Sequence, residues 1–369
     1  MNRSSIDQRR MWRDFDFVLL IAVIALVATG IVMIRSATAN SPGLIDTAQR
    51  QFLYSVAGFA LMLALALIDY RALSALQKPL YALLILLLLG VDAIGFVAGG
   101  AKSWINLGLF PMQPSELAKV LTILILARYL ATHEERMSNF FYVLLAFLIL
   151  LPPVVLIYLQ PDLGTAIVLL VIGSVMILLS GMRLLHITIL SAIGLVALPA
   201  IWLSLEEYMR ARVLLFLHPD TDPDAIYNVN QALISIGSGG WLGKGYGQGT
   251  QSQLHFLRVR HTDFIFSVVA EELGFVGALL LMSALLLVLL RLIRIAERAR
   301  DPLGRSLAVG VATMIFFQTV VSIGMNLNLM PVTGIPLPLV SYGGSSLLTM
   351  LMGIGLAESV ALRQRKIDF

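Results

Sequence analysis

The run LLILLLLG, residues 83–90, decides the fold class of this chain. A membrane strand alternates apolar and polar side chains, whereas this run is apolar without interruption. Lipid offers no hydrogen-bond partner to a backbone, so a run of this kind has to satisfy its own N–H and C=O groups, as it does in a helix. We therefore expect transmembrane helices and exclude a barrel.

The composition of the whole chain supports a membrane protein. Its 369 residues are 58% hydrophobic and 13% charged, which leaves too little polar surface to cover a water-soluble globule. Ten apolar runs bounded by charge, proline or glycine are candidate membrane spans. They are 15–34, 52–69, 80–98, 116–132, 139–158, 164–181, 184–204, 264–290, 305–327 and 343–362.

Lysine and arginine gather on one side of this ten-span layout, which predicts that both termini are cytoplasmic. We therefore predict an all-α, multi-pass membrane domain over residues 1–369. Its large extracytoplasmic loop, 205–262, joins the seventh and eighth helices. A second unusual segment, 327–342, has three prolines and no charge. Irregular backbone of that kind is tolerated at a membrane only where it is buried in protein or lines a cavity.

Charged side chains stand at the rim of the eighth span, in the stretch VRHTDFIF at residues 259–266. Arg260 and His261 precede Asp263, whose carboxylate can either cap the helix or take part in chemistry at the membrane surface. Glu271 and Glu272 follow ~12 Å further along a continuous helix. Carboxylates at membrane depth are costly, so we expect them to face a cavity or a partner.

Other charged groups have two interpretations each. Glu116 and Lys119 lie three residues apart on one helix face, either as a self-neutralising pair or as the wall of a cavity. Asp162 stands in a tight turn, where it caps a helix or faces a cavity. Arg210 and Arg212 follow the seventh span and are suited to binding phosphate or to facing lipid headgroups.

The glycine-rich run at residues 237–250 does not match the Walker A pattern, because Ser238 and Gly245 occupy positions that the motif reserves for other residues. It is either a flexible loop or a tight one in which Lys244 meets an anionic group. The chain has no cysteine and five scattered histidines, which disfavours a zinc site built from protein alone. A net charge of +4 without a basic stripe indicates contact with anionic lipid and no nucleic acid.

These residues predict a partly charged, outward-facing cavity, but they do not separate an enzyme from a transporter. Five longer segments add a resemblance. QPSELAK, QPDLGTA, the Gly-rich segment 228–251, the segment 249–277 that contains TDFIF, and PVTGIPLPLVSYGGSS closely resemble the signature segments of the SEDS family (shape, elongation, division and sporulation). Within that family the elongation type is more similar than the division type, and the match covers about residues 15–362.

The resemblance implies a peptidoglycan glycosyltransferase in the bacterial cytoplasmic (inner) membrane. Such enzymes polymerise lipid II at the outer face, release undecaprenyl pyrophosphate, and work with a class B penicillin-binding protein that crosslinks the strands. The essential aspartate of TDFIF corresponds to Asp263, which would act as general base on a sugar hydroxyl or would position it. The family's other charged motif positions, which we expect to contact substrate, correspond to Glu116, Lys119, Asp162, Glu271 and Glu272.

Cations near this site are expected to stabilise the leaving pyrophosphate, and the candidates are Arg210, Arg212, Lys244 and Arg260. The sequence requires no cofactor, although a divalent cation, Mg²⁺ or Mn²⁺, bound by carboxylate and phosphate oxygens would fit such a site. Arg258 and Val259 replace a proline and a glutamate of the family pattern, which adds a cation beside the site. Two alternatives stay open: a flippase for lipid II, and a scaffold for the penicillin-binding protein.

Overall fold

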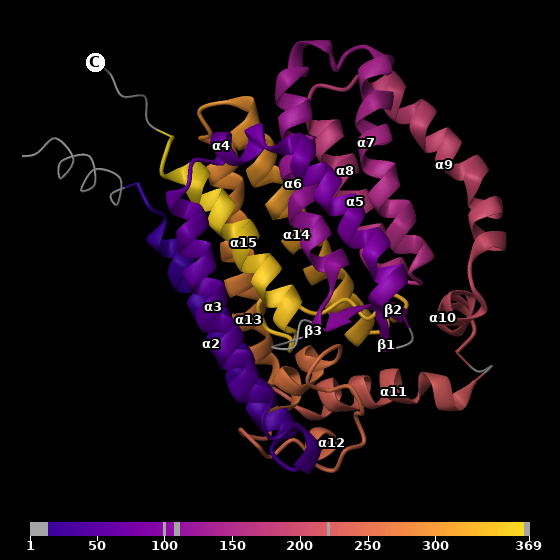
Figure 1. The fold of residues 1–369 in the computed structure, drawn as a ribbon. Coiled ribbons are helices and arrows are strands. Elements are labelled where there is room, and N and C mark those ends of the chain that lie inside the picture. Colours follow the sequence, from indigo (N-terminus) through magenta and orange to yellow (C-terminus); the bar gives the residue numbers. More distant parts are fainter. Residues whose placement is uncertain (1–13, 99–100, 107–110, 220–221, 365–369) are drawn as a thin grey trace, which may run out of the picture.

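The fold is that of a computed structural model, which describes residues 14–98, 101–106, 111–219 and 222–364 (Figure 1). Both chain ends, 1–13 and 365–369, lie outside the described residues, so the predicted cytoplasmic termini stay a prediction.

Each of the ten predicted apolar runs contains a helix; nine of these helices form a bundle, and the helix over 184–204 stands apart at its side (Figure 1). In chain order they are α2 (Phe17–Thr38), α3 (Thr47–Leu67), α5 (Gln77–Ile94), α6 (Pro114–Thr132), α7 (Phe140–Leu159), α8 (Leu163–Leu179), α9 (Leu184–Ser204), α13 (Ile265–Glu297), α14 (Pro302–Asn326) and α15 (Gly344–Ala361). A short helix, α4 (Tyr70–Ala75), joins α3 to α5.

Seven of the described helices are long and apolar enough to cross a membrane. Helices α5 and α8 offer shorter apolar stretches, and α6 carries the charged residues Glu116, Lys119 and Arg128. The structure therefore supports a helical membrane protein, and the count of ten spans stays a prediction.

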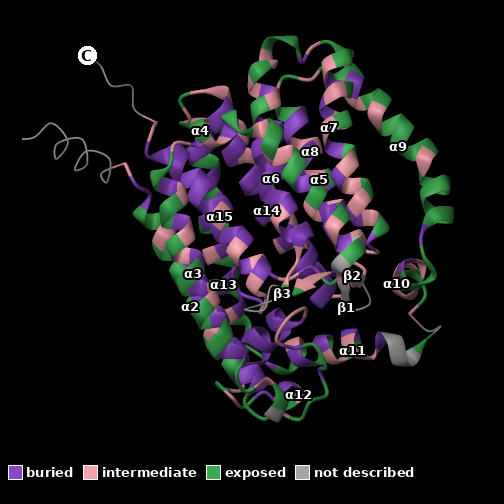
Figure 2. Ribbon diagram, in the orientation of Figure 1, coloured by how far each residue is buried: buried purple, intermediate pink, exposed green. Residues whose placement is uncertain are grey.

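The bundle has an apolar outer surface as well as a mainly apolar interior. Helices α14 and α15 form the interior, with 72% and 78% of their most apolar stretches buried, whereas the corresponding value for α9 at one edge is 6% (Figure 2). Large apolar side chains on α9, such as Val196, face outward, while the charged Lys119 is fully enclosed. Exposed apolar surface on this scale indicates contact with lipid.

One part of the fold differs from the all-α prediction. A small antiparallel sheet of order β1-β2-β3 lies between α5 and α6. Its strands are β1 (Phe96–Ala98), β2 (Ala101–Asn106) and β3 (Pro111–Met112). Phe96 pairs with Trp104, and Ile105 pairs with Met112. The predicted third span, 80–98, is therefore wrong at its end: the helix stops at Ile94 and the chain turns into a strand.

The predicted loop 205–262 also contains helices. These are α10 (Glu207–Leu217), α11 (Pro223–Ser238) and the single turn α12 (Thr250–Gln253), and they lie at one end of the bundle (Figure 1). The loop is thus a folded cap over that end.

Two features of the chain shape the same end of the bundle. Helix α13 is not continuous as predicted for 264–290, because its backbone breaks at Gly274, where φ is 70°. The proline-rich segment is irregular and partly buried as predicted, and Gln51 binds it on both sides: its side chain donates to the Ser341 carbonyl and accepts from Gly343 N–H, each at 3.2 Å. Its polar backbone groups are thus satisfied without a helix.

Candidate active site

Asp263 lies in the turn directly before α13, on a backbone that its neighbours hold in place. Asn326, the last residue of α14, donates from Nδ2 to the Asp263 carbonyl at 2.8 Å. The Ser341 hydroxyl donates to the Thr262 carbonyl at 2.7 Å, and Tyr342 N–H donates to the His261 carbonyl at 3.0 Å. Two separate segments therefore fix residues 261–263.

The carboxylate of Asp263 is not the cap of α13, so its predicted capping role is wrong, and its role in chemistry stays a prediction. The N-cap residue is Phe264, and no side chain caps it. Instead, Asn326 Oδ1 accepts hydrogen bonds from the N–H and the hydroxyl of Ser267, at 3.2 and 2.7 Å. Because Asn326 satisfies the start of the helix, the carboxylate of Asp263 is left for another role.

Arg212 is the cation beside Asp263. Its guanidinium packs over the Tyr208 ring at 4.4 Å and donates to the Val332 carbonyl at 3.2 Å. A Cβ atom at Gly334 would lie 3.8 Å from both Arg212 Nη1 and Asp263 Oδ2, so the two charged groups border the same glycine, and the charge of Arg212 acts on Asp263 without a direct ion pair. The φ of Gly334 is +74°, a left-handed conformation that favours glycine.

Burial raises the pKa of Asp263, while the charge of Arg212 and a hydrogen bond from Thr262 act in the opposite direction. The pKa of Tyr208 responds to the same charged groups. Burial raises it, Arg212 lowers it, and the charges of Asp162 and Asp263 raise it further. Tyr208 thus lies within electrostatic reach of one cation and two carboxylates. A carboxylate with a raised pKa beside a cation is a typical arrangement of an acid–base site.

Asp162 forms the second acidic group at this end. Its Oδ1 accepts from Thr165 N–H at 3.0 Å, so the predicted capping role on α8 is confirmed. Its Oδ2 accepts from Gln113 Nε2 at 3.0 Å and from the Ser115 hydroxyl at 3.2 Å. These bonds join the start of α8 to the start of α6, and Asp162 is therefore less free than Asp263 to bind a ligand.

Glu116 and Lys119 form a buried ion pair one turn inside α6. Their charged groups are 2.7 Å apart, and their side chains are 5% and 0% exposed. Among the described residues, Glu116 Oε2 and Lys119 Nζ have no polar partner other than each other. The pairing is confirmed, whereas the predicted contact with substrate stays a prediction.

Removing one member of this pair is expected to be more harmful than removing both. Glu116→Ala leaves a buried ammonium without compensation and should lower the free energy of unfolding by ~3–5 kcal/mol, whereas Glu116→Met combined with Lys119→Met should recover most of it. Thermal unfolding in detergent measures both variants. Equal, negligible shifts in the unfolding temperatures of the single and the double variant would contradict the idea that each buried charge needs the other for stability.

The other predicted cations are engaged away from Asp263. Arg210 donates to the Leu203 carbonyl at the end of α9, at 2.6 Å. Arg260 is buried and donates to the Ala37 carbonyl and, at 2.6 Å, to the Ser41 hydroxyl. Its guanidinium therefore holds the end of α2. The hydrogen bonds of Arg210 and Arg260 do not favour their predicted contacts with substrate, which stay untested.

Lys244, Glu271 and Glu272 fix the glycine-rich loop. Lys244 Nζ forms an ion pair with Glu271 at 3.0 Å, and the same carboxylate accepts from Gln251 N–H at 3.0 Å. Glu272 accepts from the Ser36 hydroxyl at 2.6 Å and from Gly247 N–H at 3.1 Å. The loop is therefore tied to α13 and α2, and the flexible-loop alternative is wrong.

Glu271 and Glu272 follow Asp263 by ~12 Å along the first part of α13, which ends at Gly274, but the contacts of this part differ from those of one straight helix that enters the membrane at Asp263. Glu272 contacts Ser36 in the last turn of α2, and the Asp263 backbone contacts Asn326 at the last residue of α14. The segment between them therefore runs across two helix ends. The break at Gly274 permits this path. Glycine is required there, because φ is +70° and a Cβ would lie 2.3 Å from the backbone nitrogen of Gly243.

His261 and Arg258 are the remaining predicted or added charged groups near Asp263 in the sequence. The His261 ring packs against Tyr342, with centroids 5.8 Å apart, and burial together with the charge of Arg260 lowers its pKa. Arg258, the added cation of this sequence, stacks on the Tyr227 ring at 5.5 Å. That stacking directs its guanidinium to α11.

Three residues of the site escaped the sequence interpretation: Tyr208, Asn326 and Gly334. Asn326 had a signal, as a polar residue at the end of an apolar run. Gly334 had another, as a glycine enclosed between prolines. Tyr208 had none, because its role depends on which face of α10 meets Asp263.

A divalent cation fits this site only together with substrate. Among the residues that the structure describes, no group of three histidine, cysteine or acidic side chains could hold a metal ion. Asp263 and Asp162 both lie within electrostatic reach of Tyr208, and Asp162 already accepts three hydrogen bonds. Mg²⁺ is often bound by one or two carboxylates plus substrate phosphates, so the missing ligands would have to be phosphate oxygens.

Comparison with known proteins places the chain in a family. The FtsW/RodA/SpoVE family, described as cell cycle protein, matches residues 17–366. The peptidoglycan glycosyltransferase MrdB of Escherichia coli K12 is 37% identical over 355 residues, which cover 96% of this chain and 95% of MrdB.

Two solved structures are similar over almost the whole chain. One comes from a study of the structural coordination of polymerization and crosslinking by a peptidoglycan synthase complex; it has a TM-score of 0.83, is 37% identical, and covers 95% of this chain and 98% of that one. The rod shape determining protein RodA of Thermus thermophilus has a TM-score of 0.73, is 35% identical, and covers 95% and 98%. The chain therefore belongs to the FtsW/RodA/SpoVE family, the SEDS family whose motifs its sequence resembles.

Proposed function

We propose that this chain is a peptidoglycan glycosyltransferase that polymerises lipid II into glycan strands during cell elongation and releases undecaprenyl pyrophosphate. The single observation that carries the proposal is the placement of Asp263 and Arg212 around Gly334, which puts a carboxylate that does not cap a helix within electrostatic reach of a cation. The names of the similar proteins support the same activity.

The proposed chemistry uses both members of that pair. Asp263 accepts the proton of the acceptor sugar's 4-hydroxyl as its oxygen attacks the anomeric carbon of the donor. The bond from that carbon to the lipid pyrophosphate breaks, and the fixed charge of Arg212 stabilises the pyrophosphate as it leaves. The Tyr208 ring and the Val332 carbonyl orient the guanidinium, so little reorganisation is needed during the reaction.

The proposed topology has ten spans, with Asp263 at the outer face of the cytoplasmic membrane. The support is that α2 and α14 both end near the site, which puts it at one face of the bundle. A sugar–pyrophosphate headgroup on a lipid tail lies at the boundary of water and lipid, where that face would meet it. The basic turn between α13 and α14, with Arg294 and Arg298, then faces the cytoplasm.

A divalent cation, in this proposal, accompanies the substrate. Mg²⁺ or Mn²⁺ would be bound by pyrophosphate oxygens with Asp263 beside them, and it would add positive charge at the leaving group. The proposed partner is a class B penicillin-binding protein, because the similar complex couples polymerization to crosslinking.

Synthesis of glycan from lipid II in detergent tests the proposal against its alternatives. Purified protein, with a class B penicillin-binding partner, should produce glycan strands that a gel resolves, and chelation with EDTA should reduce the yield. Lipid II in detergent needs no translocation, so a protein that is only a flippase would make no glycan in this assay. No glycan from folded protein that still moves labelled lipid II across vesicles would favour the flippase, and synthesis by the partner alone would favour the scaffold.

A further inference from the structure

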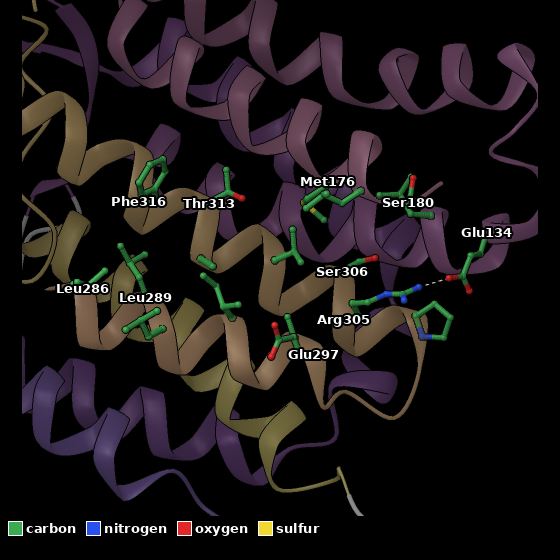
Figure 3. Close-up of a pocket in the computed structure, with 18 residues that line it drawn as sticks. Glu134, Met176, Ser180, Leu286, Leu289, Glu297, Arg305, Ser306, Thr313 and Phe316 are labelled. Atoms are coloured by element: carbon green, nitrogen blue, oxygen red, sulfur yellow. Dashed lines mark hydrogen bonds and ion pairs between the residues drawn. The ribbon is translucent and has the colours of Figure 1, made fainter. Parts of the chain in front are cut away.

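A second site lies at the opposite end of the bundle from Asp263. A groove of about 670 Å³ opens between α13, α14 and the ends of α6 and α8 (Figure 3). Its floor contains Leu130, Met176 and Ala312, which are 1%, 2% and 9% exposed. Leu290 and Phe316, which are 53% and 55% exposed, line its open side.

The groove carries charged side chains at one end only. Glu297, Arg305 and Glu134 stand at that end, and Leu286 and Phe316 stand at the other (Figure 3). Arg305 forms an ion pair with Glu134 through one nitrogen, which leaves most of its five N–H donors for a ligand. No described cation forms an ion pair with Glu297.

The length of the groove matches one leaflet of a bilayer. From Leu286 to Glu297, α13 advances ~16 Å, whereas the whole hydrocarbon core is ~30 Å thick. An acyl chain that ends in a charged headgroup fits both the length and the one-sided polarity.

We propose that this groove binds one phospholipid of the leaflet that adjoins the basic turn between α13 and α14, with a primary amine in its headgroup. The acyl chain lies on the floor formed by Leu130, Met176 and Ala312. The phosphate accepts hydrogen bonds from Arg305, and the ammonium donates to Glu297. The headgroup charges thus meet opposite charges, an arrangement that a choline headgroup, which has no N–H donor, cannot complete.

Native mass spectrometry of the full-length protein, titrated with phosphatidylethanolamine or phosphatidylcholine, tests this proposal. Wild-type protein should bind phosphatidylethanolamine about tenfold more tightly, the effect of one charge-assisted hydrogen bond. Thr313→Trp, which fills the half-buried wall of the groove, should weaken binding of both lipids about tenfold or more. Glu297→Gln is at an exposed position and should remove only the preference for the amine.

Thr29→Trp on α2 is the matched control, because Thr29 is also half-buried but lies on another surface. It should bind both lipids as the wild type does. Unchanged lipid binding by Thr313→Trp would overturn the proposal, and if that variant lost association with a penicillin-binding partner instead, the groove would be a protein-docking surface. An unchanged preference in Glu297→Gln would overturn the role of the amine.

Discussion

Replacing Asp263 by asparagine is expected to lower glycan polymerisation by ~10²–10⁴-fold, the usual contribution of a general acid–base group. The change keeps the shape of the side chain and removes its charge and basicity. Folding should survive, because Asn326 rather than Asp263 satisfies the start of α13. The measurement is the initial rate of glycan synthesis from lipid II, with thermal unfolding as the check on folding.

Asp162→Asn is the matched control for that variant. Asparagine caps a helix nearly as well as aspartate, so the bond to Thr165 N–H can persist. We expect its rate to fall less than tenfold. A folded Asp263→Asn protein that polymerises at the wild-type rate, or an Asp162→Asn protein that is equally inactive, would contradict the assignment of Asp263 as the base.

Replacing Arg212 by glutamine should reduce the rate by ~10²–10³-fold, as the removal of one preorganised donor to a developing charge does. Arg212→Lys should recover part of the rate, because it restores the charge without the planar fork that packs on Tyr208. Both rates are measured with saturating lipid II, so that weaker binding does not hide the chemical step.

Arg210→Gln provides the comparison. Arg210 lies two residues away but donates to the Leu203 carbonyl, so its loss should change the rate by less than tenfold. If Arg210→Gln were as harmful as Arg212→Gln, the positive charge of α10 as a whole would matter, and the specific pairing of Arg212 with Asp263 would be wrong.

The choice between these two arginines illustrates what the sequence could not decide. Residues two apart on a helix point to nearly opposite sides, so only the packing of α10 against the segment 331–336 selects Arg212. The sequence singled out Asp263 as the central side chain because its motif resembles that of a known family. Tyr208 depends on the same packing and therefore left no signal in the sequence.

The two glutamates show how a regular helix misleads. Glu271 and Glu272 were placed deep in the membrane by assuming one straight helix, and the break at Gly274, which follows them, lets the first part of α13 take another direction. The sequence contained the relevant residue, since glycine tolerates the positive φ found there. It did not contain the reason, which is the close approach of Gly243 from a loop about thirty residues earlier.

The helices themselves were predicted well, because a long apolar run has few alternatives in lipid. The sheet between α5 and α6 was not, because strands of two to six residues have no periodicity to recognise. The helices of the cap over residues 205–262 were missed for a related reason. Their polar and aromatic composition is typical of a loop, and tertiary contacts such as the Glu271 pair with Lys244 organise it.

The pH dependence of kcat/KM for glycan polymerisation tests the central claim, that Asp263 is the base, most directly. A base works only when it is ionised, so activity should rise tenfold per pH unit as Asp263 loses its proton and then reach a plateau. Because burial raises the pKa of Asp263, the inflection should lie above the ordinary aspartate value of 3.8. That acidic limb should be absent from the residual activity of Asp263→Asn. A wild-type profile without an acidic limb, or the same limb in the variant, would contradict the account.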